Sequence, residues 1–322
     1  MEVVRGHRHA PAWAGVAVAI GNFDGVHLGH QALITRAREL AAAHAALAVA
    51  LTFDPHPSAV IGSRGGPPAL GSLERRLELL AAAGVDAVVV EPFTLELAGL
   101  APQAFVDDVL LFALRARAII VGYDFTYGHG RAGTTDALRA HGARTGVEVA
   151  IVPAVELDGE VVSSTRIRAC LREGDVAAAA RLLGRAWDVD GVVIHGAKRG
   201  RAIGVPTANI GPRSPASAGS LHLGPPSDLP LAPGIYAVTL AVEGAAPMPA
   251  VASLGRNPTF VEDGGLVLEV HVLDWDGDLY DRRVRTTFVG RIRDELKFDS
   301  VDALVAQIRA DIDVARQLLA RT

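Results

Sequence analysis

Short apolar runs alternate with longer stretches in the first part of the chain, and the longer stretches carry apolar residues at helical spacing. Residues 15–20 and 47–53 predict buried strands, whereas residues 30–44 and 72–84 predict amphipathic helices. This βαβα order predicts an α/β fold of Rossmann-like type, with a parallel sheet covered by helices on both faces. Further strands are expected at residues 86–93, 116–122 and 147–153, and a further helix at 102–114.

The pattern changes after Arg185, where apolar and polar residues alternate and turn dipeptides such as Asp-Gly recur. This alternation predicts a C-terminal antiparallel β-barrel. Residues 300–322 predict one terminal amphipathic helix, and the Pro-, Gly- and Ser-rich residues 211–232 predict a loop. We therefore expect two domains, residues 1–185 and 186–322. The strand-like runs are residues 186–196, 234–244, 248–255 and 266–293.

Composition narrows the class of protein. The chain has 322 residues, 50% of them hydrophobic and 21% charged, and a net charge of −5 without a basic run. These values favour a soluble globular protein that does not bind nucleic acid. A single cysteine, Cys170, excludes a disulfide framework, and no stretch offers the roughly 20 apolar residues of a membrane span. We expect a cytoplasmic protein; a homo-oligomer is compatible with the sequence, which does not fix the oligomeric state.

The segment GNFDGVHLGH, residues 21–30, follows a predicted strand and leads into a predicted helix. Gly21 and Gly29 allow tight turns, and free N–H groups at the start of the helix favour an anion. His27 and His30 would add donors to the same anion. A metal site is the alternative, and it needs a third ligand, for which Asp24 and His56 are the candidates.

Three more polar segments lie in the same half of the chain. TFDPHP (52–57) and GYDFTYG (122–128) each follow a predicted strand, and parallel sheets bind ligands at the carboxyl ends of their strands. SSTRIR (163–168) combines hydroxyls that can cap a helix with two arginines, which suits a polyphosphate.

Together these motifs resemble the nucleotidyltransferases with an H-x-G-H motif. In order and spacing they are similar to the adenylyltransferase half of prokaryotic bifunctional riboflavin kinase/FAD synthetase. The resemblance implies that His27 and His30 stabilise charge on the transferred α-phosphate of ATP while FMN attacks directly to give FAD and pyrophosphate. It also implies contacts to ATP from Gly21, Phe23, Asp24, Gly29, Ser164, Thr165 and Arg168, and contacts to the flavin from Asp54, Pro55 and Asp124.

The second half extends the resemblance to nearly the whole chain. GVVIHGAKRGRAIGVPTANI (191–210), GIYAV (234–238), SLGRNPTF (253–260) and LEVHVLDWDGDLY (268–280) resemble the riboflavin kinase barrel of that family, in family order. Thr207 and Asn209 of PTAN offer neutral oxygens that suit Mg²⁺ shared with ATP phosphates. Glu269 can accept the proton of the riboflavin 5′-hydroxyl. The remaining expected contacts are Gly196, Gly200 and Gly204 to phosphate, and Asn257 and Arg291 to the flavin.

Three positions depart from the commonest family pattern. Asp124 stands where Asn or Asp occurs, Thr126 replaces a frequent arginine near the FMN phosphate, and Asp281 replaces a glycine in a turn. One alternative is therefore a riboflavin kinase with a weak or specialised N-terminal half. Another is a flavin-binding sensor or carrier with degenerate sites. A different H-x-G-H enzyme, such as one acting on pantetheine phosphate, does not fit the second half.

Overall fold

The computed structural model describes residues 1–62, 65–195, 204–211, 229–256 and 266–321. These residues form two compact units. The first unit contains Met1–Pro67 and Leu73–Ser163, and the second contains Pro68–Ser72 and the described residues from Ser164 onward. The sequence places a domain boundary at residue 185; that boundary stays a prediction.

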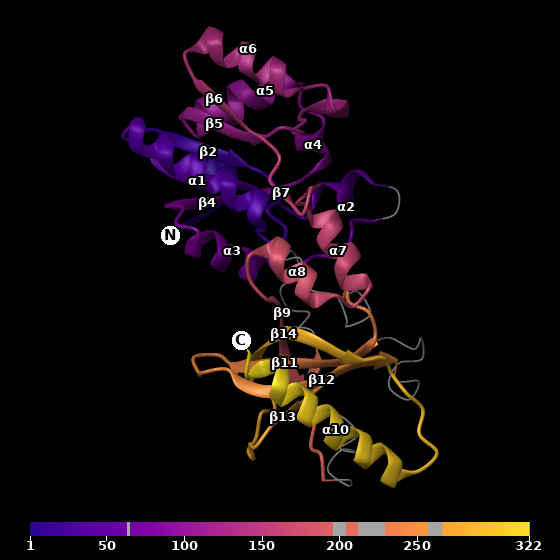
Figure 1. The fold of residues 1–322 in the computed structure, drawn as a ribbon. Helices are drawn as coiled ribbons and strands as arrows, with labels where there is room; N and C mark the ends of the chain where they lie inside the picture. Colours follow the sequence, from indigo (N-terminus) through magenta and orange to yellow (C-terminus); the bar gives the residue numbers. More distant parts are fainter. Residues whose placement is uncertain (63–64, 196–203, 212–228, 257–265, 322) are drawn as a thin grey trace. The chain divides into compact units, whose positions relative to one another are not determined.

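Six parallel strands form the sheet of the first unit within the described residues, in the order β1-β4-β3-β2-β5-β6 (Figure 1). All strands run the same way, but the order in which they are added to the sheet reverses at β2, which has β3 on one side and β5 on the other. The expected parallel sheet is confirmed. Its strands are β1 (Glu2–Arg5), β2 (Val16–Ile20), β3 (Leu47–Asp54), β4 (Ala87–Pro92), β5 (Ala116–Gly122) and β6 (Glu148–Val152).

Helices cover both faces of this sheet because each carries one apolar stripe. Leu33, Ile34 and Leu40 of α1 (Leu28–Ala43) pack with α3 (Leu73–Ala82) on one face. Leu110 of η2, a π-helical segment (Phe105–Ala113), and α6 (Thr135–Thr145) pack on the other. The shorter elements are η1 (His7–His9), α2 (Pro57–Ile61), α4 (Leu95–Ala98), α5 (Pro102–Ala104), η3 (His129–Arg131) and a hairpin of β7 (Glu156–Leu157) and β8 (Glu160–Val161).

The second unit contains a closed antiparallel barrel, in the order β10-β13-β12-β11-β14-β9. Alternate residues such as Leu268 and Val270 point into its core, as the sequence predicts. The terminal helix α10 (Val301–Leu319) packs on β11, β12 and β14 (Figure 1). The other elements are α7 (Ser164–Arg172), α8 (Val176–Leu183), β9 (Trp187–Ile194), β10 (Ala208–Gly211), β11 (Gly234–Val242), β12 (Met248–Arg256), β13 (Leu266–Val272) and β14 (Arg283–Arg293).

One buried ion pair joins the terminal helix to the barrel. The Asp311 carboxylate is 3% exposed and accepts from Nε of Arg293 at 2.9 Å and from its Nη2 at 2.7 Å. Gln307 Nε2 donates to the same carboxylate at 2.9 Å. The charge is therefore fully paired on the apolar face of the helix.

Replacing Asp311 by alanine is expected to lower the free energy of unfolding of the barrel by about 3 kcal/mol, because the Arg293 charge stays buried without its partner. Denaturant unfolding followed by circular dichroism measures this. Asp313→Ala removes an exposed carboxylate from the same helix and serves as the control. Equal stability of the two variants would contradict a structural role for the pair.

Candidate active sites

The motif loops of the first unit lie at one edge of the sheet. The segment 21–30 follows β2, residues 54–57 follow the neighbouring β3, and residues 122–128 follow β5 on the other side of β2. All three strands are parallel, so their carboxyl ends share an edge. Ligands of open α/β sheets bind at this edge, at the point where the strand order reverses. The fold therefore places three of the four predicted segments around one candidate site.

The two histidines of the first loop form a stacked pair. Their rings lie 3.6 Å apart between centroids at an interplanar angle of 18°. His27 caps α1, because its Nδ1 accepts from the backbone N–H of His30 at 3.3 Å. The helix thus begins at Leu28, two residues before the predicted start, and one of its free N–H groups is bound by His27. Nδ1 of His27 is therefore engaged in capping the helix and acts there as a hydrogen-bond acceptor.

Phe23 and Gly29 of the same loop lie close to these rings. Phe23 is fully buried with a φ of 49° and packs edge-on against His30, at 5.3 Å between centroids. A Cβ on Gly29 would lie 3.1 Å from Cε1 of His27. Gly21 begins the loop directly after β2, and Asp24 is 3% exposed. Of the four predicted residues of this loop, Phe23 and Gly29 therefore lie next to the histidine pair.

The charge state of His30 follows from its surroundings. Burial, then His27, then the guanidinium of Arg76 lower the pKa of His30 well below its usual range. His30 is therefore a neutral imidazole near pH 7. Within the described part of the chain its buried Nδ1 has no hydrogen-bond partner.

The second loop is joined to the first by hydrogen bonds. The Asn22 amide nitrogen and Nε2 of His56 lie 3.1 Å apart, and Nδ1 of His56 lies 2.7 Å from the Ser58 hydroxyl. His56 also caps the short α2, accepting from the backbone N–H of Ser58. Asp54 is 5% exposed and is followed by Pro55 through a cis peptide bond. His56, a candidate third metal ligand in the sequence, is thus engaged with Asn22 and Ser58.

The third loop brings a cation to the position that lacks the usual arginine. Nε of Arg131 donates to the Thr126 hydroxyl at 2.8 Å. Arg131 holds this place with a φ of 58°, directly after Gly130. Asp124 is exposed at the start of the same loop. Phe125 and Tyr127 stack with centroids 5.5 Å apart and give this loop an aromatic wall.

The fourth segment belongs to the second unit, where it begins helix α7. Ser164 and Thr165 are its first residues, and Arg168 is 5% exposed. Nε of Arg168 donates to the backbone oxygen of Pro68 at 2.7 Å. The predicted contacts of these three residues with ATP phosphates stay predictions.

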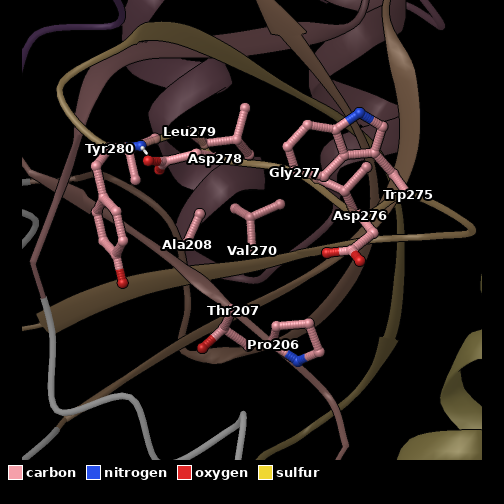
Figure 2. Close-up of a pocket in the computed structure, with 12 residues that line it drawn as sticks. Pro206, Thr207, Ala208, Val270, Trp275, Asp276, Gly277, Asp278, Leu279 and Tyr280 are labelled. Atoms are coloured by element: carbon pink, nitrogen blue, oxygen red, sulfur yellow. Dashed lines mark hydrogen bonds between the residues drawn. The ribbon is translucent and has the colours of Figure 1, made fainter.

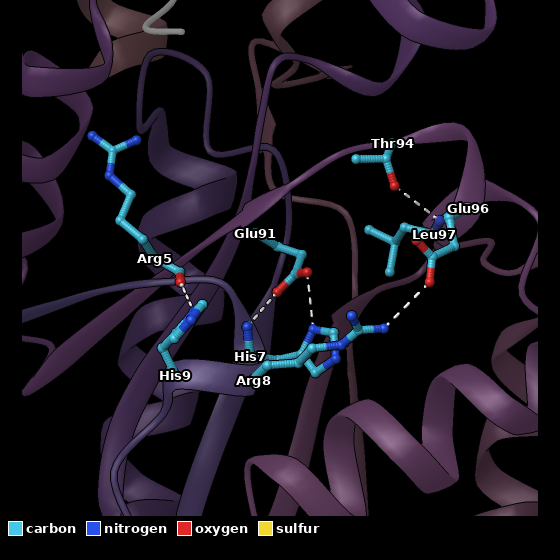
Figure 3. A network of polar contacts seen from close by, with 8 residues as sticks. All are labelled: Arg5, His7, Arg8, His9, Glu91, Thr94, Glu96 and Leu97. Atoms are coloured by element: carbon cyan, nitrogen blue, oxygen red, sulfur yellow. Dashed lines mark hydrogen bonds and ion pairs between the residues drawn. The ribbon is translucent and has the colours of Figure 1, made fainter.

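Basic side chains of the N-terminal segment at the same sheet edge contact carboxylates (Figure 3). Nδ1 of His7 lies 2.9 Å from Glu91, whose carboxylate also accepts from the His7 backbone N–H. Arg8 donates to Glu96 at 3.3 Å, and both side chains are exposed. Arg5 approaches Asp54 at 4.0 Å. These contacts fix the N-terminal segment beside the second loop.

The candidate site of the second unit is a cavity of about 400 Å³ beside the PTAN segment. Pro206 and Thr207 lie on one side of it, with Val270 of β13, Trp275 and Tyr280 around the rest (Figure 2). Its walls thus combine valines with two aromatic rings and the Thr207 hydroxyl. The turn above it is held by Asp278, which accepts from the backbone N–H of Tyr280 at 2.9 Å.

The strand register places Glu269 next to the predicted metal ligands. Asn209 of β10 stands directly opposite Glu269 of β13, and Ser253 of β12 stands opposite it on the other side. Directly opposed residues project from the same face of a sheet, with Cβ atoms roughly 5 Å apart. Glu269 and Asn209 are both half-buried, whereas Leu268 is buried in the core. A carboxylate, an amide and the nearby Thr207 hydroxyl form a donor set of hard oxygens that fits Mg²⁺.

Arg291 has a structural role in the described residues. Its guanidinium donates to the backbone oxygens of Glu173 and Pro233, and to the Asp294 carboxylate at 2.5 Å. It therefore ties the end of α7 to β11 and β14, and its predicted contact with the flavin stays a prediction.

The structure describes two other predicted positions of this half, Gly204 and Asp281. Gly204 adopts a φ of 76° and is exposed. Asp281 adopts a φ of 61°, so it holds the left-handed turn conformation in place of glycine, and its N–H donates to Val193. Gly196, Gly200, Asn257 and most of the predicted loop 211–232 lie outside the described residues.

The fold and its two candidate sites, a histidine pair at a sheet edge and an oxygen-rich group in a barrel, suit a two-domain transferase. The family model described as FAD synthetase matches residues 9–166, and the model described as riboflavin kinase matches residues 183–319. The chain therefore belongs to the family of bifunctional riboflavin kinase/FMN adenylyltransferases.

Similar proteins cover the chain nearly end to end. It is 39% identical to a bifunctional riboflavin kinase/FMN adenylyltransferase from Pseudomonas fluorescens over 99% of this chain and 98% of that protein. A protein of the same description from Escherichia coli K12 is 35% identical, covering 100% of this chain and 99% of its own. A crystal structure described as a macrolide-efflux protein from Streptococcus pneumoniae superposes with a TM-score of 0.83 at 32% identity, covering 98% and 99% of the two chains. No helix among the described residues of our chain is both long and apolar enough to cross a bilayer.

Two buried charged residues at or near these sites belong to none of the sequence motifs and were not identified from the sequence. Arg76 of α3 bonds to the end of β3, and Glu91 is the last residue but one of β4. A signal for Arg76 is present in the sequence: positions 73, 76 and 80 share one helix face, and an arginine there interrupts the apolar stripe.

Proposed function

We propose that the chain makes FMN from riboflavin in the barrel and FAD from FMN at the sheet edge, with ATP as the second substrate of both reactions. The observation that carries this is the presence of two unlike sites in one chain. One is the stacked pair of His27 and His30 where the strand order reverses. The other is Glu269 opposite Asn209, on strands β13 and β10, whose alternate residues Val270 and Ala208 line the barrel cavity.

In the adenylyl transfer, an oxygen of the FMN phosphate attacks the α-phosphorus of ATP. The new P–O bond forms as the bond to the β-phosphate oxygen breaks, and pyrophosphate leaves. The rings of His27 and His30 stabilise the charge that builds on oxygens of the α-phosphate. The reaction needs no covalent enzyme intermediate, because positioning and fixed charge suffice. Gly21, Phe23, Asp24 and Gly29 shape the loop around the nucleotide.

Flavin contacts come from the neighbouring loops. Asp54 and Pro55 follow β3, and Asp124 follows β5, so they flank the histidine loop on both sides. Arg131, held on Thr126, supplies positive charge for the FMN phosphate. The hydroxyls of Ser164 and Thr165 and the guanidinium of Arg168 are the proposed ligands of the β- and γ-phosphates.

In the phosphorylation, Glu269 accepts the proton of the riboflavin 5′-hydroxyl. The 5′-oxygen of riboflavin attacks the γ-phosphorus of the second ATP, and ADP leaves. Thr207 and Asn209 are the proposed ligands of Mg²⁺. When bound, the ion offsets negative charge on the phosphates. The valines and aromatic rings of the barrel cavity, which Thr207 also lines, suit the planar ring of a substrate. The cytoplasmic location and the oligomeric state stay predictions.

A chromatographic time course with riboflavin, ATP and Mg²⁺ tests the proposal. FMN is expected first and FAD after it, and chelation of Mg²⁺ is expected to stop both steps. FMN without FAD would restrict the chain to kinase activity. Bound riboflavin without either product would contradict the assignment of catalysis.

A further inference from the structure

A buried arginine lies beneath the histidine loop. Arg76 is 3% exposed, on the face of α3 that also buries Leu73 and Leu80. Arginine is almost never fully buried unless it is paired or has a function. Its surroundings therefore decide which of the two applies.

Hydrogen bonds connect Arg76 directly to the end of β3 and indirectly to the loop that carries the histidines. Its Nη1 donates to the Thr52 hydroxyl at 3.2 Å and to the backbone oxygen of Phe53 at 3.1 Å. The Thr52 hydroxyl donates in turn to the backbone oxygen of Asn22 at 3.0 Å. Arg76 thus ties α3 to the end of β3 and, through one hydroxyl, to the loop that carries the histidines.

The remaining donors and the charge of Arg76 also indicate a role at the histidine loop. In the described part of the chain, Nε and Nη2 of Arg76 are buried and have no hydrogen-bond partner. Burial lowers the pKa of this guanidinium, and the carboxylates of Asp24 and Asp54 partly offset that effect. An arginine remains charged even so. A fixed cation with unused donors therefore lies within electrostatic reach of His30.

We propose that Arg76 is a positioning residue of the adenylyltransferase reaction, which fixes the histidine loop against the end of β3 and supplies a permanent positive charge behind His27 and His30. This inference rests on the function proposed for the sheet edge. The adenylyl transfer concentrates negative charge on phosphate oxygens, and a buried cation stabilises such charge far more than a solvated one does. Arg8 of the N-terminal segment is not suited to this role, because its exposed guanidinium donates to Glu96 (Figure 3).

The same charge bears on His30. Burial first, then His27 and then Arg76 lower the pKa of His30, and Asp24 and Asp54 act on Arg76 itself. Removing the guanidinium is therefore expected to raise the pKa of His30 toward its usual value, although burial continues to hold it down.

The test compares Arg76→Met and Arg76→Lys in the full chain, with Arg75→Met as a matched control on the same helix. Arg75 is bound to Glu78, on the more open side of α3. Arg76→Met is expected to lower kcat for FAD formation from FMN about 100-fold, with KM for ATP changed by less than about threefold. Arg76→Lys keeps the charge and is expected to recover activity to within about tenfold of the original chain. Riboflavin phosphorylation should stay unchanged in all three.

A readout independent of activity is the NMR titration of His30, which should move to higher pH in Arg76→Met and stay in place in Arg75→Met. If Arg76→Met does not fold, Thr52→Val removes only the bridging hydroxyl and should lower FAD formation about tenfold. Equal losses in Arg76→Met and Arg75→Met, or an unmoved His30 titration together with no recovery in Arg76→Lys, would overturn the proposal. Failure of the proposed function is distinct, because the unaltered chain would then form no FAD.

Discussion

His30→Ala is expected to lower FAD formation from FMN about 100- to 1,000-fold, and to leave FMN formation from riboflavin unchanged. The His30 ring stacks on His27 at 3.6 Å and carries a buried Nδ1, so alanine removes both a donor and the support of its partner ring. The proposed kinase site lies on the barrel strands β10 and β13, which share no residue with this loop. The loss is therefore confined to one activity.

The measurement follows FAD and FMN separately by chromatography, starting once from riboflavin and once from FMN. His44→Ala is the control, because His44 ends the same helix and pairs with Glu148 at the surface. A full rate of FAD formation by His30→Ala would remove the histidine pair from the mechanism. Parallel loss of both activities would indicate a folding defect.

The second large effect is expected at Glu269. Glu269→Gln should lower FMN formation about 100- to 10,000-fold, because the amide cannot accept the proton of the 5′-hydroxyl. The side chain is nearly isosteric and half-buried opposite Asn209, so the barrel should remain folded. FAD formation from added FMN should continue at the original rate.

Initial rates with saturating riboflavin and ATP measure this effect, and Glu243→Gln provides the control. Glu243 is an exposed carboxylate that follows β11 in the same barrel. If Glu269→Gln raises KM for riboflavin but spares kcat, Glu269 binds the substrate and does not act as the base.

Local patterning predicts the parts of the fold whose apolar residues are periodic. The runs at 15–20 and 47–53 became β2 and β3, and the final amphipathic stretch became α10. The motif loops meet because β2 lies between β3 and β5, an arrangement that follows from the reversal of strand order in doubly wound sheets. No local sequence pattern marks the point where the strand order reverses. The prediction that the loops form one site therefore depended on the order and spacing of the motifs.

Long-range pairings are what the patterning could not show. Strand β1 covers only Glu2–Arg5 and depends on its parallel pairing with β4, residues 87–90. Asp311 interrupts the apolar stripe of α10, and Arg76 does the same on α3. Each is explained by a partner distant in sequence, Arg293 for Asp311 and Thr52 for Arg76. The direct opposition of Glu269 and Asn209 likewise needed the strand register.

Mixing the two inactive variants tests whether one chain carries two separate sites. Incubated alone with riboflavin and ATP, His30→Ala should stop at FMN and Glu269→Gln should make neither product. Incubated together they should form FAD, because FMN made by the first chain is adenylylated by the second. A mixture that accumulates FMN without FAD, or a Glu269→Gln chain that cannot convert added FMN, would contradict the two-site assignment.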